Sequence, residues 1–520
     1  MPTPRAHGGA PITPLNIPAP GKAGLNTEAG STLLDPAWAT VLKNVIFDSG
    51  GRIATRKGWT SATTTPAAGV IMRIHEYIKA DATAAIIMST DADIFKTIAA
   101  PTTIEGTLSI TEGNIKFVNF NDKCIALGTG TSGNPSVYTG TGNFTTVTVN
   151  SGTAPTSGIG TAAFGRLWVV DVDGHTIRYC ALLDETRWAV ADGGGTIDMD
   201  NVWPQGEDQV LAIEEFGGDL IIFGSNTIVV WTDGAGSNLG IDPTVMYVSD
   251  TIPGTGILSQ FGIARAKGDM YFISPQGLSS LARAIQYKGT TLTNVSKNIQ
   301  SQFLAYSDAE NDPNDLTLVY SPREDFLLAI FPTSNKVVMF DTRQPMEDGS
   351  FRCAEWTSDL QTACYQTKDQ TLRGSLTGTV GELMTHSGYS DDGTSYDFSY
   401  ESGWIDLGQE LNSYLKFIKK ATCFVFVAGN TTVNVSMKYD FKTTGHTVPI
   451  SVASATGGAE FSVGEWSLGE FGGGITLRTI SAPGALQGQY LKVGINLDIA
   501  SAQFALQQIN LFAKVGRIAT

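Results

Sequence analysis

The sequence has few charged residues and none of the common catalytic motifs. Only 16% of its 520 residues are Asp, Glu, Lys or Arg. It contains no G-x-S-x-G nucleophile turn, no G-x-x-x-x-G-K-[S/T] phosphate loop and no H-E-x-x-H zinc motif. Its five histidines lie about 60 residues or more apart, so no two sequence neighbours form a zinc site. We therefore expect no enzyme, no bound metal and no other cofactor.

Long apolar runs and paired cysteines are also absent. The longest apolar runs, such as Leu220–Phe223 and Ile228–Trp231, have the length of strands and not of membrane spans. The first residues, M-P-T-P-R-A-H-G-G, lack the apolar segment of a signal peptide. Five widely spaced cysteines without a C-x-x-C motif indicate free, mostly buried thiols. These features predict synthesis in a reducing cytoplasm and no membrane span.

Two groups of carboxylates could bind an ion or could simply belong to turns. Asp171 and Asp173 resemble half of a calcium loop, but the segment lacks the remaining ligands, so we favour a hairpin turn. An acidic group could hold a divalent ion, although we favour a solvated loop; it consists of Asp308, Glu310, Asp312 and Asp315.

The abundant residues indicate an all-β protein. There are 58 glycines, with many Thr, Ser and Val residues, which is typical of short strands joined by tight turns. Between residues 70 and 395 a hairpin recurs at intervals of roughly 40 to 55 residues, the length of one propeller blade. The copies are Ala84–Phe95, Lys123–Tyr138, Arg166–Tyr179, Asp219–Trp231, Asp269–Ala282, Asp325–Phe340 and Thr371–Met384. They predict a β-propeller of six or seven blades over 70–395, with an array of stacked sandwiches as the alternative.

The two ends of the chain differ from the repeat region in their residue patterns. Residues 1–23 contain six prolines and predict an extended arm without regular structure, either a disordered tail or an arm laid over a neighbouring subunit. Residues 396–520 contain longer alternating segments, such as Thr432–Tyr439 and Gln489–Ile499, and predict a C-terminal β-sandwich.

Residues 24–69 connect the arm to the propeller. Asp35-Pro36 reads as a helix N-cap followed by proline at the first helical position. The apolar residues that follow have helical spacing, which predicts a short helix over Ala37–Val45. After a Gly50-Gly51 turn, a strand carrying Arg52, Arg56 and Lys57 is expected. A second helix is expected over Lys297–Tyr306.

Three segments occur in a characteristic order. The first carries Asn26, Asn44, Asp48, Gly50, Arg56 and Gly58. The second runs from Val210 to Trp231 and is followed by Gly256–Leu278, and the third is Trp404–Lys420. The order of these segments resembles the tail nozzle proteins of short-tailed phages, also called tail tubular protein B or packaged-DNA stabilisation proteins. The resemblance implies a structural virion protein of the phage tail, forming a homo-oligomeric ring, expected to be a hexamer, below a portal and adaptor ring. It would retain packaged DNA, pass double-stranded DNA without reading its sequence, and contact tail fibre or needle proteins.

The charge of the chain is compatible with such a conduit. The net charge is −16, which argues against a dedicated nucleic-acid binder but suits a wall that repels phosphates. The alternative is that the acidity serves solubility alone. Against this background, two basic groups and one polar residue are candidates for a subunit or adaptor interface: Asn26, Arg52, Arg56, Lys57, Lys416, Lys419 and Lys420. A solvated edge strand and contact with DNA phosphate are the other interpretations of the lysines.

The alternative function is a receptor-binding or carbohydrate-binding tail protein. In that case the C-terminal sandwich would be lectin-like, and aromatic residues would stack on sugars. The candidates for stacking are Trp404, Trp466 and Phe471, which could equally belong to the core.

Overall fold

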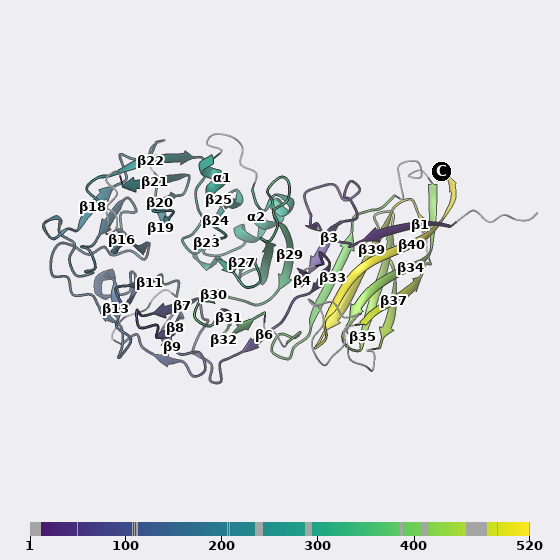
Figure 1. The fold of residues 1–520 in the computed structure, drawn as a ribbon, viewed down its shortest axis with the longest axis horizontal. Helices are drawn as coiled ribbons and strands as arrows, with labels where there is room; N and C mark the ends of the chain where they lie inside the picture. Colours follow the sequence, from purple (N-terminus) through teal and green to yellow (C-terminus); the bar gives the residue numbers. More distant parts are fainter. Residues whose placement is uncertain are drawn as a thin grey trace, which may run out of the picture.

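The computed structural model shows a ring of small sheets beside a two-sheet sandwich (Figure 1). It describes residues 12–518 except for 49, 107, 109, 111–112, 205, 207, 234–242, 287–293, 385–387, 407–413, 454–475 and 486. The described part is almost entirely β, with two short α-helices, α1 (Leu281–Gln286) and α2 (Gln300–Asp308). None of the helices in this part is long and apolar enough to cross a membrane.

Six blades of the ring are separate antiparallel sheets. Four consist of consecutive strands: β7 (Arg73–Ile78), β8 (Ala84–Ser89), β9 (Ile94–Lys96) and β10 (Thr102–Thr103); β11 (Phe117–Phe120), β12 (Lys123–Ala126), β13 (Ser136–Tyr138) and β14 (Thr145–Thr146); β15 (Gly160–Ala163), β16 (Arg166–Val170), β17 (Thr176–Tyr179) and β18 (Gly195–Asp198); β19 (Val210–Phe216), β20 (Asp219–Gly224), β21 (Thr227–Asp233) and β22 (Met246–Pro253). The fifth has β23 (Ile263–Ala266), β24 (Asp269–Ser274) and β25 (Gly277–Ser280). The sixth has β30 (Thr362–Gln366), β31 (Thr371–Leu376), β32 (Thr379–Leu383) and the N-terminal strand β6 (Trp59–Ser61).

One further position in the ring is shared with the sandwich. The strands β26 (Thr317–Ser321), β27 (Phe326–Phe331), β28 (Lys336–Asp341) and β29 (Arg352–Thr357) lie between β23–β25 and β30–β32 and continue into a ten-stranded sheet. All seven hairpins expected from the repeat are antiparallel pairs, from β8–β9 to β31–β32. The prediction of an all-β propeller is therefore confirmed.

The ring is closed by a strand that precedes the first blade in the sequence. β6 pairs antiparallel with β32, with Thr60 opposite Glu382. Since β32 ends the last blade, the N-terminal segment supplies that blade's outer strand. The edge of β32 is thus paired across the closure, and β6 becomes the outer strand of this blade.

The C-terminal residues form a sandwich that also takes up the N-terminal strands. One sheet contains β34 (Tyr414–Val427), β37 (Thr476–Pro483), β38 (Gln487–Gly488), β40 (Phe504–Ile518), β1 (Ile12–Pro18), β4 (Val45–Phe47) and β5 (Ile53–Thr55). The other continues from β29 through β3 (Trp38–Lys43), paired with β2 (Gly24–Leu25), to β33 (Tyr396–Ser402), β39 (Leu491–Ile499), β35 (Thr431–Tyr439) and β36 (His446–Val452). Phe398 of β33 and Phe504 of β40 are fully buried with ring centroids 5.0 Å apart, so the two sheets face each other.

Two predictions about the N-terminal region were wrong. Residues 12–18 of the supposed irregular arm are strand β1, which pairs along its whole length with β40. The helix expected over Ala37–Val45 is replaced by strands β3 and β4, separated by Asn44 at a φ of 54°. The Asp35 carboxylate does accept the N–H of Ala37, as a cap would, but β3 pairs with β29 and β33, and this tertiary pairing overrides the local helical spacing. The helix expected over Lys297–Tyr306 is confirmed by α2 and the short 3-10 turn before it.

Candidate functional site

The residues expected at a subunit interface do not form one surface. Lys419 and Lys420 are exposed on β34, and Lys57 is half-buried. The others are buried within the chain: Asn26, Arg52, Arg56 and Lys416. The structure therefore gives most of these residues intramolecular roles, and of the seven only Lys419 and Lys420 are exposed to a partner.

Asn26 and Lys416 stabilise local backbone. The Asn26 side-chain oxygen accepts the N–H groups of Glu28 and Ala29 at 3.1 and 3.0 Å, so it shapes the turn after β2. The Lys416 ammonium donates to the carbonyl of Gln489 at 2.6 Å. Burial lowers the pKa of Lys416.

Arg52 lies in the sandwich. Its Nε donates to the Asp48 carboxylate at 2.8 Å, and both side chains are buried. Its Nη1 donates to Gln507 at 3.1 Å, and its guanidinium lies 4.7 Å from the centre of the Phe426 ring. Arg52 thus ties the turn between β4 and β5 to strands β40 and β34.

Arg56 lies at the joint between propeller and sandwich. Its Nη1 and Nη2 donate to the two carboxylate oxygens of Asp391 at 2.8 and 2.5 Å, and its Nε donates to Asn44 at 3.0 Å. The guanidinium lies over the ring of Tyr396 at 4.1 Å. Asp391 also accepts the backbone N–H of Trp59, the first residue of the closing strand β6. Because a planar guanidinium makes two parallel hydrogen bonds to one carboxylate, it fixes the orientation of that carboxylate as well as pairing its charge.

Asn44 and Gly58 complete this joint. The Asn44 amide donates to Thr357, the last residue of β29, and to the carbonyl of Asp397 in β33, both at 2.7 Å, so it links the propeller and the sandwich directly. Gly58 lies so close to Ser390 that a Cβ atom would come within 1.8 Å of its carbonyl oxygen. Three of the residues that carry the resemblance in the first segment, Asn44, Arg56 and Gly58, therefore lie where the ring closes and joins the sandwich.

A cavity of about 550 Å³ lies beside the joint. Its lining includes Trp59, Lys336, Asp359, Asp391 and Asp397. Two of its carboxylates already have partners, because Asp391 binds Arg56 and Asp397 accepts from Asn44. Within the described ranges, no three His, Cys, Asp or Glu side chains are grouped so as to hold a metal ion.

A second site lies where the inner strands of the blades converge, and its key residue is Arg73 at the start of β7. Its Nη1 donates to Met72 and Thr317 at 2.9 Å, its Nη2 donates to the carbonyl of Asn314, and its guanidinium lies 3.7 Å from the centre of the Phe261 ring. These partners lie just before β7, β23 and β26, or at the first residue of β26. Burial lowers the pKa of Arg73 to about 9, although the charges of Asp315 and Asp312 oppose the shift.

The inner strands are also bridged by an ion network. Lys116, just before β11, pairs with Glu214 of β19 at 2.8 Å. Arg265 of β23 pairs with Glu215 at 2.9 Å and with Glu214 at 3.4 Å. Side chains from the blades that contain β11, β19 and β23 therefore contact one another across the ring.

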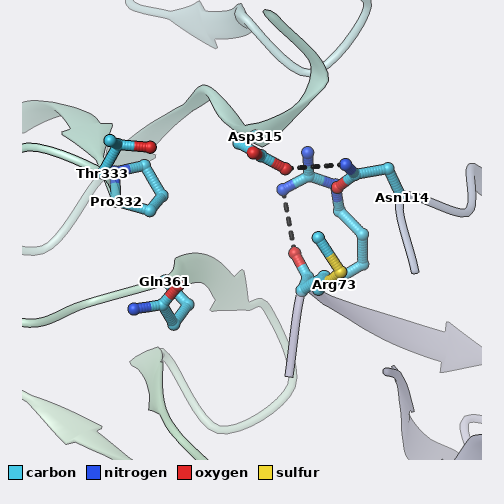
Figure 2. A pocket seen from close by; sticks show the side chains of 7 residues that line it. Arg73, Asn114, Asp315, Pro332, Thr333 and Gln361 are labelled. Carbon is cyan, nitrogen blue, oxygen red and sulfur yellow. Dashed lines mark hydrogen bonds between the residues drawn. The ribbon is translucent and has the colours of Figure 1, made fainter. Parts of the chain in front are cut away.

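Beside Arg73 lies a cavity of about 150 Å³, hereafter the axial cavity, lined by Met72, Arg73, Asn114, Asp315, Pro332, Thr333 and Gln361. In Figure 2 these side chains surround the space, with Arg73 and Asn114 on one side and Pro332 and Thr333 on the other. The Asn114 amide donates to Asp315 at 2.8 Å. Thr333 is exposed at the mouth.

The carboxylate groups considered in the sequence have structural partners. Asp173 accepts the N–H groups of His175 and Thr176 at 2.9 Å, which confirms the hairpin turn. Asp312 accepts the N–H of Asn314 and caps a 3-10 turn. Glu310 accepts the N–H of Thr333 at 3.0 Å.

The aromatic candidates for sugar stacking are only partly described. Trp404 is 9% exposed and packs on Phe441, with ring centroids 4.9 Å apart. Trp466 and Phe471 lie outside the described residues. The sandwich therefore presents Phe441, which is 56% exposed, more openly than Trp404.

Sequence reasoning missed the axial cavity. Its seven lining residues come from five separate stretches of the chain, and none of them belongs to a recognisable motif. The one available signal is Arg73 itself, a cation at the start of R-I-H-E-Y-I, the first strand of its blade, which also carries His75 and Glu76. That signal gives no hint of its partners.

Fold and sites define the class of this protein as a β-propeller closed by an N-terminal strand and fused to a β-sandwich. No family model and no curated protein matches the chain. Among solved structures, it is similar to the extracellular domain of a hybrid two-component system of B. thetaiotaomicron, with 12% identity over 68% of this chain and 51% of that one, at a TM-score of 0.29. It is also similar to the AfRom2 CNH domain (11% identity, 55% of this chain and 89% of that one, TM-score 0.29) and to apo AztD from Citrobacter koseri (10%, 60% and 90%, 0.27). The chain spans about half the length of the first of these, and likenesses at such TM-scores carry no argument about function.

Proposed function

We propose that this chain is a tail nozzle subunit of a short-tailed phage, a structural protein of the virion with no catalytic role. The observation that carries the proposal is the joint around Arg56. Five of the residues behind the resemblance, including Asn44, Arg56 and Gly58, lie at this joint or in the adjoining turn between β4 and β5. A segment that both closes the ring and anchors the sandwich gives each subunit the rigidity that a channel wall needs.

In this proposal, DNA passes between subunits and not along the axis of one propeller. The inner strands are joined by the 2.8 Å ion pair of Lys116 and Glu214 and by the bonds of Arg73, which leave no room for a duplex. The channel therefore belongs to a homo-oligomeric ring, expected to be a hexamer, below the portal and adaptor. The net charge of −16 supports a wall to which DNA does not adhere.

The decisive experiment is assembly of the purified chain. We expect rings by mass photometry and electron microscopy, either alone or on addition of a portal–adaptor complex, and loss of packaged DNA from virions that lack the chain. A chain that stays monomeric with these partners and is absent from virions would overturn the proposal. Binding to host glycans without any assembly would favour the receptor-binding alternative.

The exposed lysines of β34 provide a test of docking. If Lys419 and Lys420 contact an acidic ring, replacing both by Glu should weaken assembly and remove part of its salt dependence. Lys442→Glu is a matched control, because Lys442 is also exposed on the sandwich. Equal assembly of the double variant and the control would exclude a docking role for this pair.

A further inference from the structure

Strand β22 is a long, unprotected edge at the outer rim of the ring (Figure 1). It has eight residues and, within the described part of the chain, pairs only with β21. The outer strands β10, β14 and β18 of the three preceding blades have two, two and four residues. Folded proteins usually keep free edges short or place lysine or proline on them, because a free edge pairs with other chains. β22 has no lysine, and its one proline, Pro253, is its last residue.

The outer half of β22 is also apolar and exposed. Tyr247 is 53% exposed and Val248 36%, and Val245, just before the strand, is 42% exposed. At the other end of the strand, Ile252 is buried in one cluster with Leu281 of α1, so the helix packs on that end. Free backbone groups next to exposed apolar side chains make the outer half a docking surface, hereafter the β22 edge.

The charge around the β22 edge is negative. Residues 188–264 contain eleven acidic residues and no Lys, Arg or His. Two cations from other blades, Lys116 and Arg265, pair with carboxylates of this blade, but they do so at its inner strand β19, at the opposite side of the sheet from β22. Asp233 of β21 and Asp250 of β22 lie beside the exposed half. Two β22 edges joined across a twofold axis would bring these carboxylates together, so the charge favours a basic partner over an identical edge.

The sandwich of the same chain presents a surface of matching character, hereafter the lysine surface. Lys419 and Lys420 are adjacent and both exposed, since the register of β34 against β40 shifts between Ile418 and Lys420. Neither lysine makes an ion pair within the described residues. The half-buried Phe417 and the exposed Pro483 lie beside them, with Pro483 opposite Lys420. This surface therefore combines two unpaired cations with apolar side chains.

We propose that the β22 edge of one copy binds the lysine surface of the next copy. β22 and β34 lie toward opposite ends of the long axis (Figure 1), so one copy cannot make this contact with itself. The contact joins two different surfaces and is therefore heterologous, and its repetition gives a ring where the rotation closes. Apolar side chains such as Tyr247 and Phe417 are buried at its centre, and the lysines meet the acidic blade. This inference rests on the proposed function, whose ring it builds from two named surfaces.

The test measures assembly of the full chain by mass photometry at several salt concentrations, alone and with a portal–adaptor complex. Val248→Lys should weaken assembly about tenfold at low salt, since it sets a lysine against the lysine surface. Val172→Lys is the matched control, because Val172 is 80% exposed in a hairpin turn of the neighbouring blade. A chain that combines Val248→Lys with Lys419→Glu and Lys420→Glu restores opposite charges and should assemble again. Tyr247→Lys replaces Val248→Lys if thermal melting shows that the latter does not fold.

The inference is overturned if the Val248→Lys chain assembles as well as the Val172→Lys control, or if the combined chain assembles no better than Val248→Lys. It is also overturned by a dimer that Lys419→Glu with Lys420→Glu leaves intact while Val248→Lys abolishes it, because that result would show pairing between two β22 edges. In the first two cases the tail nozzle proposal stands as long as the unchanged chain forms rings. An unchanged chain that stays monomeric with every partner overturns both proposals.

Discussion

Replacing Arg56 by Met should open the closure of the propeller. The change removes the two hydrogen bonds to Asp391, the bond to Asn44, and the contact with the Tyr396 ring at 4.1 Å. Breaking a buried ion pair costs about 3–5 kcal/mol. Because the Asp391 side chain is 27% exposed and can be rehydrated, we expect the lower value, about 3 kcal/mol.

The effect should be local, because Asp391 also holds the first N–H of β6. A loss of about 3 kcal/mol corresponds to roughly 150-fold faster exchange of amide hydrogens that become exposed by opening of this joint. Hydrogen exchange followed by mass spectrometry should show it in peptides covering β6 and β32, with blades on the far side of the ring unchanged. Arg56→Lys keeps the charge but loses the planar fork, and should give an intermediate effect.

A surface arginine provides the control. Arg187 is 51% exposed and pairs with Asp184 and Asp192, an arrangement worth less than about 1 kcal/mol. If Arg56→Met accelerates exchange in β6 and β32 no more than Arg187→Met does, the joint does not hold the ring closed and the reasoning fails.

Three further predictions concern the closure, the pH dependence and the N-terminal strand. Gly58→Ala should destabilise the chain by about 3 kcal/mol or more, since its Cβ would lie 1.8 Å from the Ser390 carbonyl oxygen; a thermal melting temperature within about 1 °C of the unchanged chain would contradict this. Burial alone would raise the pKa of Asp341, but hydrogen bonds from Arg343 and the charges of Arg352 and Arg343 lower it overall. The ionised Asp341 should therefore stabilise the fold above about pH 4, and this stabilisation should be lost as the pH falls further. Asp341→Asn should flatten the decrease of the unfolding free energy in acid, and an unchanged decrease would refute the assignment. Deletion of residues 1–18 should expose β40 and promote aggregation through its free edge, as measured by light scattering, while a fully monodisperse truncated chain would argue against pairing by β1.

Local patterns in the sequence predicted the propeller well. Each expected hairpin joins strands adjacent in the chain, and its turn and alternation are properties of about a dozen consecutive residues. The pairing of β27 with β28 shows this, with Phe331 opposite Lys336 across a short turn. The same holds for the long alternating strands of the sandwich, such as β35 and β39.

The roles of individual residues followed from long-range contacts that no local pattern contains. Lys416 and Lys420 are four residues apart, so a regular strand would place them on the same face of the sheet. Lys416 is nevertheless buried against Gln489 and Lys420 is exposed, because the register of β34 against β40 shifts between Ile418 and Lys420. Arg56 and Asp391 are 335 residues apart in the chain. A basic group that looks like a docking surface in sequence is, in part, the interior of a joint.

The sequence by itself determined an all-β chain with a repeated hairpin and a sandwich of longer strands, since turn chemistry and side-chain alternation act over short distances. Only the tertiary structure decided that residues 38–43 are a strand and not a helix, because β3 gains its partners from β29 and β33. It also decided how the ring closes and which side chains line the axial cavity. These features arise where distant segments compete for the same hydrogen bonds and buried space, and that competition is settled only when the whole chain is folded.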